Sequence, residues 1–254
     1  MLTKCKICVA KTAGFCFGVD RAVKIVYNEL DNRNNVVTLG PIIHNPNVVS
    51  DLEAKGVYST DVDKVTKDQT VVIRSHGVGL DVYEKLAEVG AEVIDATCPF
   101  VARIAAEKSG EGYVILIAGD EAHPEIMGIR GHCSGESYVF SSCDDFENLV
   151  KEKDFSSKKV AILAQTTYNK NMWRKCEELF ERYLPEAVVY NTICSATSER
   201  QKEAAELAKA ADIMIIVGGL HSSNTHKLKA ICDEYCKCWL VEDAEGLRAC
   251  DIDL

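Results

Sequence analysis

Three cysteines occupy equivalent places in an internal repeat of the chain. Cys16, Cys98 and Cys194 each stand before a helical pattern, which is followed by an apolar strand, a glycine and a polar loop. A histidine in that loop follows its cysteine after 25 to 28 residues. The dipole of a helix favours a thiolate at its N-terminus. Each cysteine is therefore a candidate nucleophile or metal ligand, whereas any one of them alone would be interpreted as a buried cysteine at a tight turn.

Small polar side chains follow the apolar strands in each repeat. Histidine, hydroxyl and amide groups can bind a phosphate-like anion without lysine or arginine. For a single histidine, a hydrogen-bonded loop residue is at least as good an interpretation, but the repetition at equivalent strand ends favours an anion site. The candidate residues are His44, His76, His123, Thr166, Ser222, Ser223 and Asn224.

Glu125 follows His123 by two residues and comes directly after a proline. In a dry site with a raised pKa, this carboxyl group could act as a proton donor. The alternative is a carboxylate in the first turn of a helix, where the dipole favours it. The sequence alone does not decide between the two.

Strand and helix patterns alternate along the chain, which predicts parallel sheets. Ligands gather at the carboxyl ends of such strands, and every polar loop named above lies at one. The predicted strands cover residues 7–10, 36–40, 70–73, 92–95, 113–118, 138–140, 160–164, 188–190, 213–217 and 239–242. The predicted helices cover residues 19–30, 48–55, 81–89, 101–108, 145–150, 171–183, 198–210 and 226–235.

The repeat predicts the fold class: α/β, with three small units related by a pseudo-threefold axis, a trefoil that brings the three cysteines to one centre. The units are expected over residues 14–97, 98–193 and 194–254, and a strand within residues 4–12 is expected to close the third. Compared with the other two, the third unit lacks one further strand and its polar loop. We therefore expect that the chain ends before this unit is complete.

The composition excludes several classes of function. The chain has 254 residues, of which 47% are hydrophobic, and a formal net charge of -10. This charge argues against nucleic acid and anionic membranes as partners. No apolar run is long enough to span a membrane and no secretory signal is visible, so a cytoplasmic protein is expected.

Twelve cysteines in such a chain indicate metal binding, catalysis or burial rather than disulfides. Three of them, converging without a fourth ligand, suggest an iron–sulfur cluster with one iron open to substrate. Zinc with three thiolates and a water is the competing interpretation. Cys232 and Cys236 are predicted to share a helix face near Cys238, so a second metal site is an alternative there, but burial or simple surface exposure of these thiols is the preferred interpretation.

The motifs together resemble the 4-hydroxy-3-methylbut-2-enyl diphosphate reductase family, which acts last in the methylerythritol phosphate route to isoprenoids. The resemblance runs in order from about residue 6 to residue 245. Its motifs are Ala13-Gly14-Phe15-Cys16-Phe17-Gly18-Val19, Gly40-Pro41-Ile42-Ile43-His44-Asn45, Ser75-His76-Gly77-Val78, Asp95-Ala96-Thr97-Cys98-Pro99, His123-Pro124-Glu125 with Gly128, Gln165-Thr166-Thr167, Cys194-Ser195-Ala196-Thr197 with Arg200-Gln201, and Ser222-Ser223-Asn224.

The resemblance implies a 4Fe-4S cluster held by Cys16, Cys98 and Cys194, with the substrate hydroxyl on the unique iron. It implies that Glu125, with Thr166, delivers protons while the histidines and residues 222–224 hold the diphosphate. Two electrons, from a donor such as ferredoxin or flavodoxin, together with protons would remove the hydroxyl as water. Protonation of an allylic intermediate then gives isopentenyl or dimethylallyl diphosphate.

One departure from the family pattern bears on activity. The family has a further Ala-Gly-Ala-Ser type loop near its C-terminus whose serine binds the diphosphate, and nothing after Leu240 matches it. A C-terminally truncated chain is therefore expected. Two other functions stay open: a zinc-dependent hydrolase or lyase of a phosphorylated substrate, and an inactive, truncated binding module.

Overall fold

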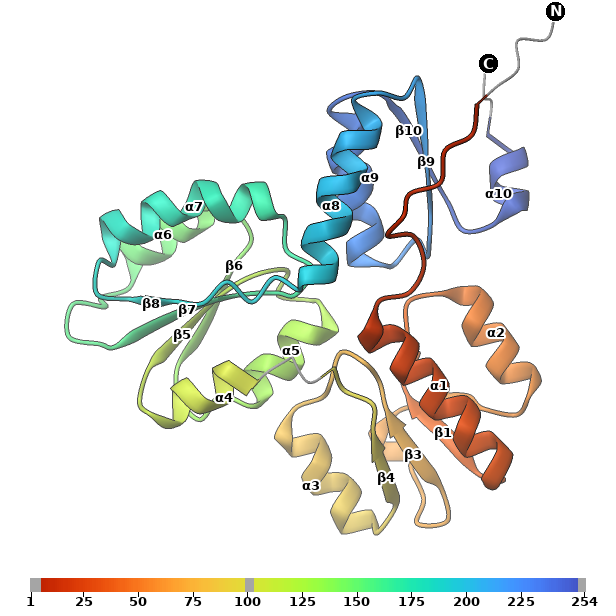
Figure 1. Ribbon diagram of the computed structural model, residues 1–254. Helices are drawn as coiled ribbons and strands as arrows, with labels where there is room; N and C mark the ends of the chain where they lie inside the picture. Colours follow the sequence, from red (N-terminus) through yellow and green to blue (C-terminus); the bar gives the residue numbers. More distant parts are fainter. Residues whose placement is uncertain (1–5, 99–102, 251–254) are drawn as a thin grey trace, which may run out of the picture. The chain divides into compact units, whose positions relative to one another are not determined.

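The computed structural model describes residues 6–98 and 103–250 (Figure 1). Within them, helices alternate with strands that form three sheets, and every strand pair is parallel. The first sheet has the order β2-β1-β3-β4 and the second the order β6-β5-β7-β8, while β9 and β10 form the third. The strands are β1 (Val36–Leu39), β2 (Tyr58–Thr60), β3 (Thr70–Ile73), β4 (Glu92–Asp95), β5 (Val114–Ala118), β6 (Ser137–Phe140), β7 (Val160–Ala164), β8 (Val188–Val189), β9 (Ile213–Val217) and β10 (Lys237–Val241).

The helices between these strands confirm the predicted α/β pattern. Part of the helix predicted over residues 101–108 lies outside the described residues, and α4 is described from Arg103 onward. The strand β2 and the helices α5, α10 and η1 are not among the predicted ranges. The helices are α1 (Phe17–Asn32), α2 (Pro46–Ala54), η1 (Val62–Lys64), α3 (Leu80–Val89), α4 (Arg103–Gly110), α5 (Pro124–Gly131), α6 (Cys143–Glu152), α7 (Lys170–Tyr183), α8 (Ser195–Ala208), α9 (Ser223–Asp233) and α10 (Ala244–Arg248).

The chain divides into two compact lobes. The larger lobe consists of residues 16–43 and 48–194 and contains both four-stranded sheets, whereas the smaller lobe contains residues 6–15, 44–47 and 195–250. Each of the three predicted ranges, 14–97, 98–193 and 194–254, contains one of the sheets, but the boundaries of those ranges stay a prediction.

The second sheet shows how the sequence places helices on both of its faces. Successive residues of a strand point to opposite faces. Leu116 and Ile162 pack with aromatic side chains of α6 and α7, whereas Ile115 and Ile117 pack with α4 and α5. β5 and β7 are buried along their whole length. Such continuous apolar runs are typical of parallel strands that are covered on both faces.

The predicted strand over residues 7–10 is wrong. Residues 6–10 are coil, and the side chains of Ile7 and Val9 are 86% and 75% exposed; residues 4 and 5 lie outside the described part. In both four-stranded sheets the last strand pairs with the third and not with the first. In the described part of the third sheet only β9 and β10 are present. The third strand with which a closing strand would pair is therefore missing from this part.

The expectation that no cysteines form disulfides is also wrong. Cys143 on α6 and Cys176 on α7 form a disulfide, with their Cα atoms 5.3 Å apart. Both belong to the core between the two helices and the second sheet. Facing helices place the two thiols within the normal Cα separation for a disulfide, a tertiary relation that their separation of 33 residues does not reveal.

In the third sheet, burial is confirmed for Cys232 and Cys238, which lie in a small core with Ala204 and Ile216. Cys236 does not share the helix face of Cys232, because α9 ends at Asp233. Among the described residues, no helix is both long and apolar enough to cross a membrane.

The disulfide has a measurable consequence. It restricts a loop of 33 residues in the unfolded chain, so its removal in Cys143→Ser should lower the free energy of unfolding by about 2–4 kcal/mol. Urea unfolding of protein prepared without reductant measures this change, with Cys133→Ser as the control. Peptide mapping of the same preparation should find Cys143 linked to Cys176. Recovery of both as alkylated thiols without prior reduction would contradict the assignment.

Candidate active site

The Cys98 thiol lies against the first turn of the helix that begins after Cys16. Cys16 is the N-cap residue of that helix, and Gly18 lies in its first turn. A Cβ atom on Gly18 would stand 2.8 Å from the Sγ atom of Cys98, so only glycine lets the helix approach this thiol so closely. The backbone N–H of Cys98 also donates to the carbonyl of Ser75, at 3.0 Å. The Cys98 thiol is thereby held between α1 and the loop after β3.

The loop that leads into Cys98 is closed by Asp95. One carboxylate oxygen of Asp95 accepts from the backbone N–H of Thr97 at 2.8 Å, and the other accepts from the hydroxyl of Tyr83 at 2.8 Å. Burial, together with the neighbouring Asp95 carboxylate, raises the pKa of Tyr83 to about 12. The tyrosine therefore keeps its proton and remains a donor over the physiological pH range.

Cys194 lies beside the proposed proton donor. Its backbone N–H donates to the carbonyl of Thr166 at 3.0 Å. The N–H of Thr166 donates to Oε1 of Glu125 at 2.6 Å, and its hydroxyl lies 2.8 Å from Oε2. The Glu125 side chain is only 1% exposed. The structure thus brings Cys194, Thr166 and Glu125 together at the carboxyl end of the second sheet.

Two of the candidate histidines meet at the start of α5. The rings of His76 and His123 lie edge to face, with their centroids 5.5 Å apart. His123 is the N-cap of α5, and its Nδ1 accepts from the backbone N–H of Glu125 at 3.1 Å. An accepting Nδ1 in a neutral imidazole places the proton on Nε2, which makes that atom a donor.

The remaining candidates lie in the smaller lobe. Ser222 is the N-cap of α9, and Ser223 and Asn224 form its first turn. The buried Oδ1 atom of Asn224 has no hydrogen-bond partner among the described residues. His44 lies before α2, and a Cβ atom on Gly219 would collide with its carbonyl. The backbone N–H groups at a helix N-terminus have the chemistry of an anion site, whereas Oδ1 of Asn224 is an acceptor and would bind a donor.

The three cysteines have the chemistry of a metal-centre donor set. Cys16, Cys98 and Cys194 are partly buried free thiols. Cys16 is the N-cap of α1 and Cys194 directly precedes α8, so helix N-termini favour both thiolates. Three cysteine thiolates suit an iron–sulfur cluster with one open iron, and a zinc ion with a bound water would use the same three.

A family model described as "LytB protein" matches residues 7–253 of the chain. The 4-hydroxy-3-methylbut-2-enyl diphosphate reductase of Thermoanaerobacter sp. (strain X514) is 43% identical over 251 residues, which cover 95% of this chain and 85% of the relative. The chain belongs to this reductase family. It is accordingly an oxidoreductase, and its family is one of isoprenoid biosynthesis.

Other members of the reductase family agree. The Clostridioides difficile (strain 630) reductase is 39% identical over 94% of this chain and 86% of its own length. A solved (E)-4-hydroxy-3-methyl-but-2-enyl diphosphate reductase structure matches with 37% identity and a TM-score of 0.69, covering 96% of this chain and 89% of that one. The Plasmodium falciparum reductase matches with 26% identity and a TM-score of 0.84, covering 94% and 76%. These matches confirm the α/β fold class.

Arg74 is a charged residue beside this site that the motif reasoning did not select. It follows β3 directly, and its guanidinium lies against Gly40, where a Cβ atom would stand 2.9 Å from Nη1. Burial lowers the pKa of Arg74. Its position in the sequence, at the end of an apolar strand and next to Ser75 and His76, could have identified it as a candidate site residue.

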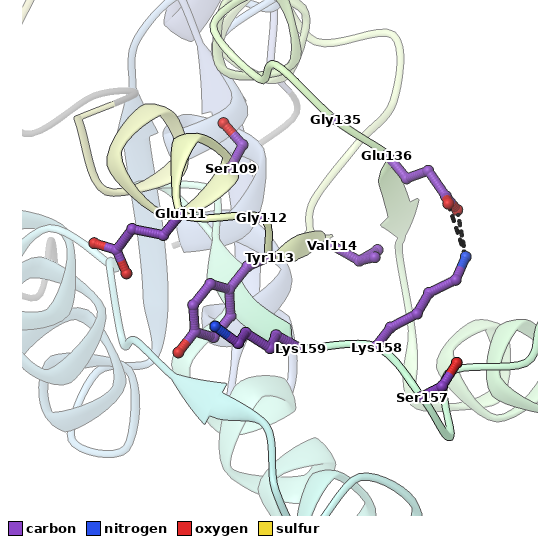
Figure 2. A pocket seen from close by; sticks show the side chains of 10 residues that line it. All are labelled: Ser109, Glu111, Gly112, Tyr113, Val114, Gly135, Glu136, Ser157, Lys158 and Lys159. Carbon is purple, nitrogen blue, oxygen red and sulfur yellow. Dashed lines mark hydrogen bonds and ion pairs between the residues drawn. The ribbon is translucent and has the colours of Figure 1, made fainter.

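A pocket of about 400 Å³ lies away from the candidate residues of the reductase, at the amino ends of β5, β6 and β7 (Figure 2). Its lysines already have partners: Lys158 pairs with Glu136 at 2.7 Å, and Lys159 lies over the ring of Tyr113 at 5.6 Å. None of the predicted site residues lines it.

Close backbone packing fixes α5, which carries Glu125, against the loop after β3. A Cβ atom on Gly131 would stand 2.5 Å from the Cα atom of Gly79. Gly131→Ala should therefore lower the free energy of unfolding by about 1–3 kcal/mol, because backbone has to move. Gly135→Ala is the control, since nothing lies within 4 Å of its added Cβ. Equal stability of the two variants in thermal or urea unfolding would contradict this packing.

Proposed function

We propose that the chain catalyses the reductive dehydroxylation of 4-hydroxy-3-methylbut-2-enyl diphosphate. The substrate takes up two electrons and two protons, its C–O bond breaks, and the products are water and isopentenyl or dimethylallyl diphosphate. The observation that carries the proposal is the buried Glu125 carboxyl group, bound by Thr166 directly beside Cys194. A redox centre and a proton source are the two components that this reaction requires.

Cys16, Cys98 and Cys194, three partly buried free thiols, would hold a 4Fe-4S cluster, and the close approach of Gly18 to the Cys98 thiol supports this role. When bound, such a cluster supplies electrons and a Lewis-acidic iron without a protein ligand. The electrons would come from a one-electron carrier such as ferredoxin or flavodoxin. The three thiols are only partly exposed, so the surrounding chain limits access of water and oxygen.

The candidate histidine, hydroxyl and amide side chains would bind the diphosphate. In the larger lobe, His123 presents a donor Nε2–H, with His76 beside it and Thr166 nearby. In the smaller lobe, the resemblance assigns the same role to His44, Ser222, Ser223 and Asn224. Neutral donors and helix N-termini can compensate a dianionic group without a lysine.

Glu125 would deliver the protons. Its side chain is buried, so water does not compete for the proton it transfers. The N–H and hydroxyl of Thr166 hold both carboxyl oxygens, which fixes the direction of transfer. Protonation at either end of the three-carbon allylic unit of the substrate would give one or the other product.

Two paired substitutions test the proposal. After anaerobic reconstitution, Cys98→Ser should lose iron and sulfide, while Cys133→Ser, a control at another partly buried free cysteine, should retain both. Glu125→Gln should keep the iron content but lower kcat by roughly 10²–10⁴-fold, because the proton is lost. Glu121→Gln is its control, since Glu121 pairs with Arg130 at the surface.

Three measurements check these outcomes: iron, sulfide and zinc content, the visible absorbance of the cluster, and substrate turnover with a chemical reductant. Wild-type protein that is colourless and contains zinc would refute the reductase proposal. Equal iron in wild type and Cys98→Ser would refute the ligand assignment. Iron–sulfur loading without turnover would instead favour a binding module.

A further inference from the structure

Arg21 ties the helix of one proposed ligand to the loop of another. It lies on α1, five residues after Cys16. Its guanidinium donates to the carbonyl of Thr97 at 3.2 Å and, over a longer distance of 3.4 Å, to the carbonyl of Asp95. These carbonyls belong to the loop that enters Cys98. The contact at Gly18 occurs on the same helix, so α1 holds both the loop and the thiol.

Arg200 repeats this arrangement in the smaller lobe. It lies on α8, six residues after Cys194. Its guanidinium donates to the carbonyls of Thr12 and Gly14, each at 2.9 Å. Gly14 stands two residues before Cys16, so the two Cα atoms can be no more than about 7–8 Å apart. The loop that enters Cys16 is therefore fixed to the helix that follows Cys194.

Glu203, about one turn further along α8, binds the same loop. Its carboxylate accepts from the backbone N–H groups of Lys11 and Thr12, at 2.7 and 2.8 Å, and from the Thr12 hydroxyl at 2.6 Å. These hydrogen bonds lower the pKa of Glu203, and the hydrogen bond from the Thr12 hydroxyl has the largest effect. One helix thus binds both the N–H groups of this loop, through Glu203, and its carbonyl groups, through Arg200.

The helix after Cys98 carries an arginine at the same offset as Arg21, without such contacts among the described residues. Arg103 stands five residues after Cys98. Its side chain is 78% exposed and pairs with Glu107 on its own helix, at 2.9 Å. Among the described residues, no carbonyl contact of Arg103 corresponds to those of Arg21 and Arg200. It provides an internal control in the same chemical and sequence context.

We propose that Arg21 and Arg200 are positioning residues for the cysteine ligands. Each guanidinium joins the helix after one cysteine to two carbonyls of the loop before another, from Cys16 to Cys98 and from Cys194 to Cys16. The planar guanidinium donates to two acceptors at once, which lysine does not reproduce. We call each arginine with its two carbonyl contacts a clasp. The clasps hold the loops in place before the cluster binds, so less conformational entropy is lost when it binds. This inference rests on the proposed cluster.

The test compares Arg21→Ala and Arg200→Ala with Arg103→Ala and wild type. After anaerobic reconstitution, the rate of iron release to an excess of chelator is followed by the cluster absorbance. The two clasp variants should release iron roughly tenfold faster than wild type, since each loses two charge-assisted hydrogen bonds. Arg103→Ala should release it at the wild-type rate. Thermal unfolding of the cluster-free proteins shows whether the fold is otherwise unchanged.

Tryptic cleavage provides a readout that does not need the cluster. The Lys11–Thr12 bond lies inside the loop bound by Arg200 and Glu203, so it should be cut faster in cluster-free Arg200→Ala and Glu203→Ala than in wild type. Cleavage at Lys67, in an exposed turn, should not change. Unchanged cleavage at Lys11 would show that the clasp does not hold the loop and would overturn its assignment.

Conservative variants keep the proposal testable if an alanine variant fails to fold. Arg21→Lys and Arg200→Lys retain the charge but can satisfy only part of the carbonyl pair, so their iron release should be intermediate. Release from the clasp variants at the rate of Arg103→Ala would overturn the inference while leaving the proposed function intact. Wild-type protein that takes up no cluster would overturn both.

Discussion

Parallel strand pairing is the constraint on which the rest of this structure depends. Every strand pair among the described residues is parallel, so each strand is followed by a crossing element, and the carboxyl ends share one edge. The loops with Ser75, Thr97 and Thr166 all follow such ends. Neighbouring loops can therefore form hydrogen bonds with one another: the backbone N–H of Cys98 donates to the carbonyl of Ser75, and that of Cys194 donates to the carbonyl of Thr166. Reactive groups from distant parts of the sequence lie close together because the loops that carry them all begin at the same edge of a sheet.

Glycines let helices pack directly against the loops and thiols of the site, and this close packing holds the site residues in place. Gly18 brings α1 against the Cys98 thiol, and Gly131 brings α5 against Gly79. Interiors packed to this density transmit small displacements, so α5 and its Glu125 side chain are fixed relative to the loop after β3. The paired hydrogen bonds of Thr166 then fix the carboxyl group itself. Such a site requires little reorganisation when a substrate binds.

The sequence predicted most of the regular structure, for identifiable reasons. The largely apolar runs at β3 and β7 are followed at once by polar residues and the run at β9 by two glycines, so their predicted bounds agree with the structure. The strand over residues 7–10 failed because a strand needs a partner, and pairing is not a local property. The Cys143–Cys176 disulfide was missed because it depends on how α6 and α7 face each other.

The candidate site was predicted less completely than the fold. Residue types and spacing were enough to select Glu125 and Thr166, and the structure places these two in contact. The contacts of Arg21 and Arg200 could not be predicted, because both arginines lie on helix surfaces where a solvated charge is the ordinary expectation. Arg103 shows that the same offset gives just such an exposed charge. Only the tertiary structure distinguishes the three.

The central claim is that three cysteines hold a cluster whose remaining iron is open to substrate. Mössbauer spectroscopy of wild-type protein reconstituted with ⁵⁷Fe tests it most directly. We expect about one iron in four to occupy a site distinct from the others, and the spectrum of that site to change when the diphosphate substrate is added. Four equivalent irons that do not respond to substrate, or protein that retains no iron, would contradict it.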